Sequence, residues 1–383
     1  NTGWMHGDIK LATLSDTDDT NVTGSELVTN STFATDVSGW TTNSVGTITH
    51  SNGTAVLTNV QADRTRANQA ITTEIGKTYV LTYNASGNRN FLHIGSIHFN
   101  VGLNQDGPHQ QTFVATSTST NIQIGVSTTG IGNTATFDNI SVRLAESDRS
   151  VNNKGLQVFG TVTKTAVATG ADLVGYGPFS SANFLQQPVN TDINNLNPRA
   201  IMCWVKASQH ASAYQYLWSI SDHTTYHYGL AIYTGTSGDG GKLYSYDQEN
   251  GIGQSSYMIA DGNWHCVVFT DDETTKRIYV DGKLEYSVAQ SYDLNSANKQ
   301  NMQLRIGTYE SGNHAMVSGS LSLLRVSGTI PTPEQIAKMY NDEKYLFKEN
   351  AKATLYGTSD QVSALAYDDD TELLHVGTNA GRS

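Results

Sequence analysis

Apolar and polar residues alternate along residues 264–288, and this stretch gives the clearest structural signal in the chain. The apolar positions form three runs: Trp264, Cys266 and Val268, then Ile278 and Val280, then Leu284, Tyr286 and Val288. A period of two predicts three consecutive β-strands, and it predicts that Trp264 faces the core. Asp281-Gly282 separates the last two runs. Because this dipeptide favours the positive φ angles of a type I′ turn, we expect a tight hairpin there.

Short alternating runs also recur at regular spacing in the first half of the chain. They include Tyr79, Leu81 and Tyr83, then Ile122, Ile124 and Val126, then Ile140, Val142 and Leu144. Turn-forming Gly, Asn and Ser residues separate these runs, which predicts a β-sandwich of about 120 residues.

One short helix is expected near the end of the second half. Thr332 is a suitable N-cap, Pro333 suits the first turn, and Gln335 completes a capping box. The residues that would form its apolar stripe against a sheet are Ile336, Met339, Tyr340 and Phe347.

These patterns predict an all-β chain of two tandem sandwich domains, at residues 21–148 and 149–347. The polar stretch 145–155 marks a linker between them. Residues 1–20 contain a strand-like run, and residues 348–383 contain a β-hairpin, and both are too short to fold alone. We therefore expect the two ends, from the same chain or from neighbouring chains, to share a sheet in a flanking module that the sandwiches interrupt.

Composition and charge narrow the classes of partner. The 383 residues are 37% hydrophobic and 15% charged, with a net charge of -12. An acidic chain disfavours nucleic acid and anionic membranes as partners, and no apolar run reaches the about 20 residues needed for membrane insertion. The two cysteines, Cys203 and Cys266, lie on alternating strands with apolar neighbours and are expected to be buried thiols.

Two family resemblances refine the fold. The pattern W-H-x-V-x-F-T-D…R-I-Y-V-D-G-K resembles laminin-G-like, concanavalin A-like jelly rolls, in which this DG hairpin is central. The opening L-V-x-N-x-x-F…G-W and the closing F-D-N-I-S-V-R of residues 26–144 resemble carbohydrate-binding-module sandwiches allied to families 4 and 9. The second resemblance implies that Phe33 and Trp40 are core residues.

Aromatic residues crowd the segment 214–257 and suggest carbohydrate binding, because sugar C–H faces stack on rings. They are Tyr214, Tyr216, Trp218, Tyr226, Tyr228, Tyr233, Tyr244, Tyr246 and Tyr257. Alternation predicts that Tyr226 shares a sheet face with Tyr228, and Tyr244 with Tyr246. We select Trp218 and those four tyrosines as candidate ligand contacts, while a place in the sandwich interior remains the alternative. In the first sandwich the candidates, with Arg64 and Asn68 beside them, are Arg66, His93 and His98.

Catalytic and metal signatures are weak. No E-x-D-x-E run supplies the paired carboxylates of a glycosidase, so we expect a binding protein and not an enzyme. No cofactor is predicted. The acidic cluster at residues 16–21 lacks the glycine and glutamate of a calcium loop, and the run 319–324 lacks a carboxylate that related sandwiches carry. Calcium binding stays open, with Asp222, Asp239, Asp247 and Glu310 as candidate loop ligands.

A third resemblance concerns the whole chain. The phrases G-W-M-H-G-D-I-K and V-F-G-T-V-T-K-T-A-V-A-T-G-A-D-L-V, with the C-terminal hairpin, resemble large tail-fibre or tail-tip proteins of tailed bacteriophages. This resemblance implies an extracellular virion tail protein that binds host surface glycans for attachment. It also implies contacts with other virion tail proteins and a homo-oligomer, a trimer. The alternatives are a purely structural fibre component without a ligand and a polysaccharide depolymerase.

Overall fold

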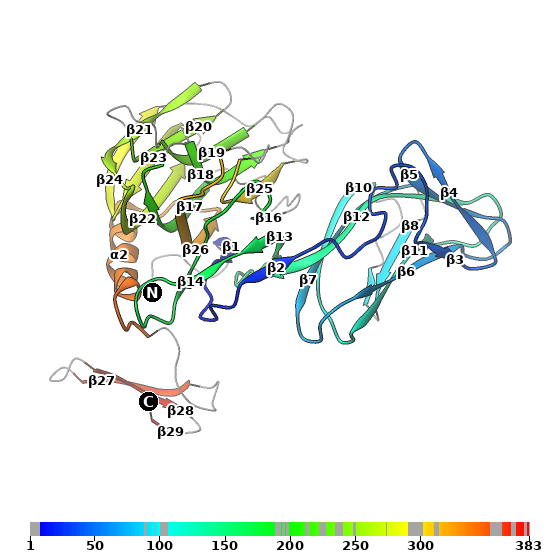
Figure 1. The fold of residues 1–383 in the computed structure, drawn as a ribbon, viewed down its shortest axis with the longest axis horizontal. Helices are drawn as coiled ribbons and strands as arrows, with labels where there is room; N and C mark the ends of the chain where they lie inside the picture. Colours follow the sequence, from blue (N-terminus) through cyan, green and yellow to red (C-terminus); the bar gives the residue numbers. More distant parts are fainter. Residues whose placement is uncertain are drawn as a thin grey trace.

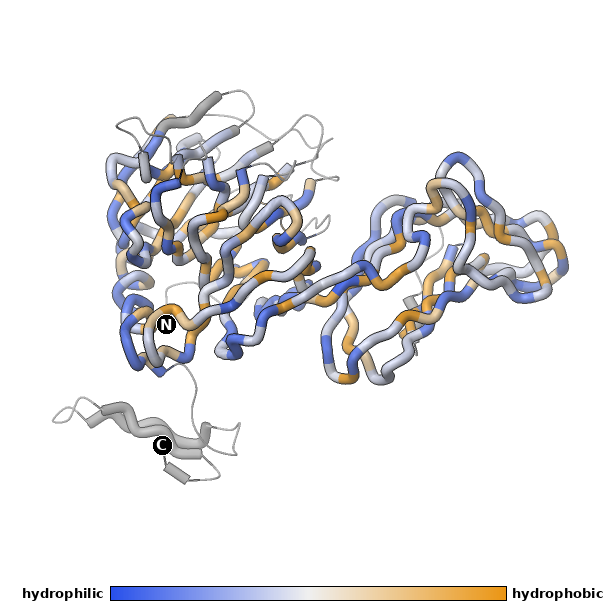
Figure 2. Tube along the Cα trace, viewed as in Figure 1, coloured by the Kyte–Doolittle hydropathy of each residue, from blue (hydrophilic) through white to orange (hydrophobic). Residues whose placement is uncertain are grey.

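The computed structural model describes most of the chain as two β-sandwiches and a small terminal sheet. The described residues are 8–87, 90–95, 97–99, 106–187, 193, 196, 199–210, 214–221, 227–233, 240–247, 250–272, 274–289, 302–309, 314–352, 362–368, 373–378 and 381–382. Figure 1 shows the two sandwiches lying end to end, joined near β12 and β13. Hydrophobic and hydrophilic positions alternate along many of their strands (Figure 2), as the sequence predicts.

The first sandwich is built by residues 25–146. One sheet contains β3 (Thr41–Thr42), β6 (Arg66–Thr72), β11 (Ser119–Val126), β8 (Asn90–Ile94) and β9 (Ile97–Phe99). The facing strands are β4 (Gly46–Ser51), β5 (Thr54–Asn59), β12 (Thr134–Glu146), β7 (Thr78–Ser86) and β10 (Gly107–Val114). Phe33 and Trp40 lie in the core between these layers, which confirms their predicted role.

The second sandwich has two large sheets. The first contains β14 (Lys164–Ala166), β15 (Val174–Tyr176), β26 (Gly319–Ser327), β17 (Arg199–Ser208), β22 (Asp261–Asp271), β23 (Thr275–Val280) and β24 (Lys283–Ala289). The second contains β13 (Leu156–Val162), β16 (Phe184–Gln187), β25 (Gln303–Ile306), β18 (Tyr214–Ser221), β19 (His227–Tyr233), β20 (Lys242–Asp247) and β21 (Asn250–Met258). Their inner faces enclose one apolar core that includes Trp218, Phe269 and Leu324.

The N-terminal segment belongs to the second sandwich and not to a flanking module. Strand β1 (Ile9–Thr13) pairs with β26, and β2 (Val22–Gly24) pairs with β13. The first sandwich is thus inserted into the second, between β2 and β13. The predicted sheet shared by the two ends is wrong within one chain, because β1 finds its partner in β26.

The C-terminal strands form a sheet of their own. Strands β27 (Val362–Asp368), β28 (Leu373–Thr378) and β29 (Gly381–Arg382) pair only with one another among the described residues. The predicted hairpin in this segment is confirmed by the antiparallel pairing of β27 with β28.

The polar segment 145–155, predicted as a linker, forms an ordered connection between the sandwiches. Strand β12 pairs with β13 through Ala145 and Glu146, so one 13-stranded sheet runs through both sandwiches. In the loop that follows, the Asp148 carboxylate accepts hydrogen bonds from the backbone N–H groups of Ala12 at 3.0 Å and Lys154 at 2.9 Å. Asp148 is only 4% exposed. A carboxylate held this way fixes the loop against β1.

The predicted helix is present as α2 (Pro333–Glu343), followed by the 3₁₀ turn η2 (Lys344–Phe347). Thr332 and Gln335 form the predicted capping box. The helix covers the outer face of the first sheet, where the Trp204 ring stacks on Phe347 at 4.2 Å between centroids. Strands β17 and β22 are consequently buried on both faces.

Trp264 faces this helix-covered side and not the sandwich interior. Its indole N–H donates to the Val167 carbonyl at 2.8 Å, and its ring lies 5.0 Å from that of Phe347. Cys266 lies on the same side as Trp264, whereas Cys203 points into the sandwich core. Both cysteines are buried free thiols, as predicted.

The predicted hairpin between β23 and β24 is confirmed. Asp281 and Gly282 have φ angles of 50° and 79°, as a type I′ turn requires. The Asp281 carboxylate also holds His265, whose Nδ1 lies 2.8 Å away, while Asp261 approaches Nε2 at 3.1 Å. Burial alone would lower the pKa of His265, but the hydrogen bonds and charges of these two carboxylates outweigh it and raise the pKa above 6.5.

Candidate functional site

A group of aromatic rings lies on the outer face of the 13-stranded sheet. Leu230 and Leu243 point into the core. Successive side chains of a strand alternate between faces, and paired residues of antiparallel strands share a face, so the neighbours of these leucines along β19 and β20 point outward. We call the resulting group the tyrosine surface; it consists of Tyr214, Tyr216, Tyr233, Tyr244, Tyr246, Tyr309 and His314.

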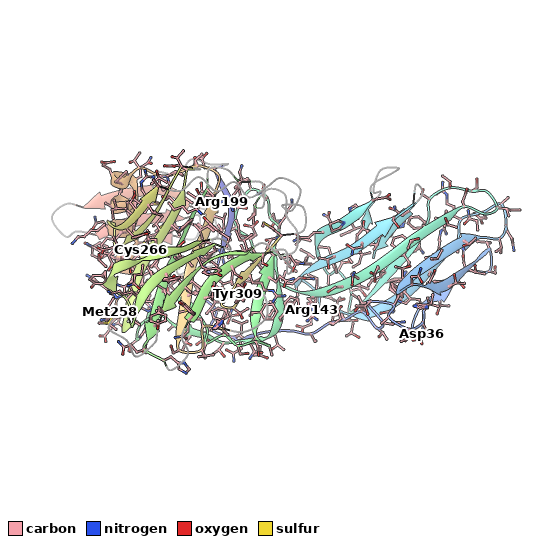
Figure 3. The ribbon with its side chains drawn as sticks, turned by 90° about the horizontal axis from the view of Figure 1, so that it is seen from above. Asp36, Arg143, Arg199, Met258, Cys266 and Tyr309 are labelled. Carbon is pink, nitrogen blue, oxygen red and sulfur yellow. The ribbon has the colours of Figure 1, made fainter. Side chains whose placement is uncertain are left out.

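The rings of the tyrosine surface contact one another across several strands. Tyr214 lies 5.1 Å from Tyr233 and 5.5 Å from Tyr244 between ring centroids. Tyr216 lies 5.0 Å from Tyr309, and His314 is within 6.4 Å of Tyr214, Tyr216 and Tyr309. Figure 3 labels Tyr309 on the second sandwich. These distances are typical of aromatic pairs in favourable contact.

A glycine makes room for one of these rings. A Cβ atom built on Gly229 would lie 2.7 Å from Cε1 of Tyr216, so any larger residue would displace that ring. Tyr216 is therefore held flat across β19 and is only 7% exposed. Its neighbours Tyr214, Tyr233, Tyr244 and Tyr309 are partly exposed. The surface thus offers ring edges and faces above a tightly packed base.

The phenol groups lie close enough to affect one another. Burial raises the pKa of Tyr214, and the neighbouring Tyr244, Tyr233 and Tyr246 raise it further. The Tyr214 hydroxyl group consequently stays neutral well above pH 7. The phenol group of each tyrosine in the surface can donate or accept a hydrogen bond. Such a set can contact both the C–H faces and the hydroxyl groups of a sugar.

Only part of the predicted aromatic set belongs to this surface. Tyr244 and Tyr246 share its face, as alternation predicts. Trp218 and Tyr228 are corrections, because they are 0% and 2% exposed and pack against Phe269 inside the core. A β-bulge between Tyr216 and Trp218 turns the Trp218 ring inward. Tyr226 lies outside the described residues.

Five members of the surface were not among the selected contacts. Three of them, Tyr214, Tyr216 and Tyr233, belong to the aromatic segment 214–257, and the other two lie outside it. Tyr309 and His314 follow β25, which is distant in sequence from the segment 214–257. They reach the surface because β25 pairs with β18, bringing the end of β25 beside Tyr216. No local pattern in the sequence marks this pairing.

The candidates in the first sandwich lie on a separate face. Asn68 and His93 are both paired with Gln123, which places the three side chains in one row on the outer face of β6, β11 and β8. Arg66 is exposed on the same side of β6. His98 pairs with His93 through β9, and its side chain lies outside the described residues. These residues do not meet the tyrosine surface.

The acidic candidates for calcium do not form a site in the described residues. Asp16 forms an ion pair with Lys164 at 2.8 Å, which occupies one of the three carboxylates of the acidic cluster at residues 16–21. The side chains of Asp222, Asp239, Asp247 and Glu310 lie outside the described residues. The described part of the chain contains no cluster of three or more His, Cys, Asp or Glu side chains that could hold a metal ion. Nor does this part contain a helix long and apolar enough to cross a membrane.

Comparison with solved structures gives likenesses of limited extent. Domain 4 of an extracellular GH43 arabinanase from Geobacillus stearothermophilus, in complex with arabinotriose, has a TM-score of 0.40 and 17% identity, covering 51% of this chain and 92% of that one. The receptor-binding domain of a botulinum neurotoxin C/D mosaic serotype has a TM-score of 0.39 and 14% identity, covering 52% of this chain and 49% of that one. A CBM4 structure has a TM-score of 0.26 and 18% identity, covering 30% of this chain and 98% of that one. With such scores these neighbours carry no argument about function.

Comparison by sequence gives one family. No curated protein matches the chain. Residues 181–337 match the concanavalin A-like lectin/glucanases superfamily, in its Laminin_G_3 family. This match covers less than half of the chain and lies within the second sandwich, whose two large sheets and short helix agree with it. Residues 181–337 thus form a laminin G-like, concanavalin A-like domain.

Proposed function

We propose that this chain binds neutral glycans through the tyrosine surface of its second sandwich. The observation that carries the proposal is the outward grouping of rings from β18, β19 and β20 with Tyr309 and His314. Partly exposed rings that carry hydroxyl groups favour a polyhydroxylated ligand, since stacking and hydrogen bonding act together. The superfamily name of the matched domain, which includes lectins, supports the same class of ligand.

The finer proposal is a role in attachment by a phage virion. We propose that the chain is an extracellular tail-fibre or tail-tip component, contacts other tail proteins and acts as a trimer on host surface glycans. This role is supported by the resemblance of several stretches of the sequence, at both ends and between them, to such proteins. Per-site binding should be weak, roughly micromolar to millimolar, and several copies on one particle would raise the overall strength. Antibody labelling of purified virions, with light scattering for the oligomeric state, tests this role.

A glycan array tests the binding proposal. The full chain, presented in multimerised form, is expected to bind neutral bacterial glycans on the array. The Tyr244→Ala variant is expected to bind them about tenfold more weakly, because a stacking ring is lost. Tyr345→Ala is the matched control, since Tyr345 is 56% exposed and lies on η2 outside the tyrosine surface. Equal binding by Tyr244→Ala and the control would refute the tyrosine surface. Absence of binding across a broad array would favour a purely structural role.

A further inference from the structure

A groove of about 530 Å³ lies where the two sandwiches meet on the 13-stranded sheet. One wall comes from the first sandwich, through β7 and the start of β10. The other comes from β13, β16 and β25 of the second. The polar side chains of its lining include Thr82, Asn84, Ser86, Gln157, Gln186 and Gln303. We call this feature the junction groove.

The polar side chains that line the junction groove are amides and hydroxyl groups, with one histidine, His109. No Asp, Glu, Lys or Arg occurs among the described residues that line it. Gln157 and Gln186 are 3% and 7% exposed. The Gln157 side-chain N–H donates to the Ser141 hydroxyl group at 3.3 Å, and the Gln186 side-chain carbonyl accepts from Arg305 at 2.9 Å. The other end of each amide, the carbonyl oxygen of Gln157 and the N–H group of Gln186, makes no hydrogen bond among the described residues. A lining that offers amide donors and acceptors without net charge suits the hydroxyl groups of a neutral saccharide.

The groove has a fixed shape because both walls are tied together. The Gln187 amide donates to the Gln110 side chain at 3.1 Å, across the two sandwiches. On the outer face of β13 and β16, the rings of Phe159 and Phe184 stack at 4.5 Å with 7° between their planes. Arg143 lies 4.2 Å above the Phe159 ring, and Figure 3 labels it where the sandwiches meet. A wall held by strand pairing, amide bonds and stacked rings presents a preorganised site.

The junction groove and the tyrosine surface lie on the same face of one sheet. Directly paired residues lead from one to the other, in the order Gln157, Gln186, Arg305, Ser219, Gly229 and Tyr246. With neighbouring strands about 4.8 Å apart, this row of five steps spans about 24 Å. Tyr216 lies over Gly229, between the two ends of the row. A single extended ligand along the row would meet amides at one end and rings at the other.

We propose that the junction groove is a second saccharide subsite, which binds the continuation of a neutral glycan chain held by the tyrosine surface. This proposal rests on the proposed function and adds to it a site built jointly by both sandwiches. It gives the ordered connection between them a role, because the pairing of β12 with β13 holds Gln157 of the second sandwich beside the first.

The test is titration calorimetry of the full chain with neutral gluco-oligosaccharides, from the disaccharide to the octasaccharide. Asn84→Ala removes a groove amide whose side chain makes no hydrogen bond recorded among the described residues. It is expected to weaken binding of the longest members about tenfold, while leaving the shortest, which fit the tyrosine surface alone, unchanged. Ser86→Trp, which fills the exposed edge of the groove, should act in the same direction. Thr78→Ala is the control, because Thr78 lies on the same strand and face but outside the groove.

The two proposals fail in different ways. If Asn84→Ala and Ser86→Trp fold with unchanged melting temperature and bind every length like the control, the groove is not a subsite. If Tyr244→Ala has no effect at any length while Asn84→Ala weakens binding, the groove is supported and the tyrosine surface is refuted. Lack of binding by the unaltered chain throughout the series would overturn both.

Discussion

The contact between the β23–β24 turn and α2 gives a sharp prediction about stability. Gly282 has φ of 79°, and a Cβ atom there would lie 3.0 Å from Cα of Ala337 in the helix. Gly53 occupies the same position in the β4–β5 hairpin, with φ of 76° and nothing within 4 Å of such a Cβ. The two glycines share a backbone conformation and differ in what lies above them.

Alanine substitution at each glycine separates the two effects. An alanine forced into the left-handed region costs about 1 to 2 kcal/mol, which is the whole cost expected for Gly53→Ala. Gly282→Ala adds contact with helix backbone, and overpacking of this kind costs about 1 to 3 kcal/mol more. We therefore expect Gly282→Ala to lower the free energy of unfolding by about 2 to 5 kcal/mol.

Calorimetry of both variants checks this difference, with fluorescence of the tryptophans to follow the helix contact at Trp204. Lys283→Ala serves as the control, because that side chain is exposed one residue further along. Equal losses from Gly53→Ala and Gly282→Ala would mean that α2 does not rest on the turn, and would refute the packing described here.

Three further predictions follow from the second sandwich. Trp264→Phe should lower the free energy of unfolding by about 1 kcal/mol, because the indole hydrogen bond is lost. Trp264→Ala should lower it by about 2 to 3 kcal/mol, less than for a fully buried ring, because the Trp264 ring is only partly buried. Chemical denaturation measures both. Since the folded pKa of His265 is raised above 6.5, its stabilisation is complete below that pH and is lost as the pH rises through the folded pKa. Melting temperatures across this range should show the loss, and His265→Gln should flatten it. Because burial raises the thiol pKa values, to about 12 for Cys203 and well above 9.0 for Cys266, neither thiol should react with an aromatic disulfide reagent until the chain unfolds.

Local chemistry in the sequence predicts those parts of the fold that depend on neighbours in the chain. The turn at Asp281-Gly282 follows from two residues that tolerate positive φ, and the cap of α2 follows from Thr332 and Gln335. Alternation also groups Trp264 with Cys266 correctly. It does not indicate which layer they face, since a strand buried on both sides is apolar on both faces.

Partners distant in sequence are the part that local patterns do not specify. Ile9 pairs with Ser327, and the period of β1 would fit the edge of any sheet. The polar stretch 145–155 reads as a linker because its composition is that of an exposed loop. Its order depends on Asp148 reaching the backbone of Ala12, which no spacing in the sequence indicates. Tyr309 and His314 join the tyrosine surface for the same reason, through the pairing of β25 with β18.

The shared sheet also determines how two subsites would cooperate. Binding at a second site is intramolecular once the first is filled, and its gain depends on whether the ligand spans the fixed separation. A flexible linker would spread that separation and make affinity rise gradually with ligand length. Here the row of paired residues that leads from Gln157 to Tyr246 sets the distance. Affinity should therefore rise steeply at the length that first reaches from the tyrosine surface to the junction groove, and little beyond it.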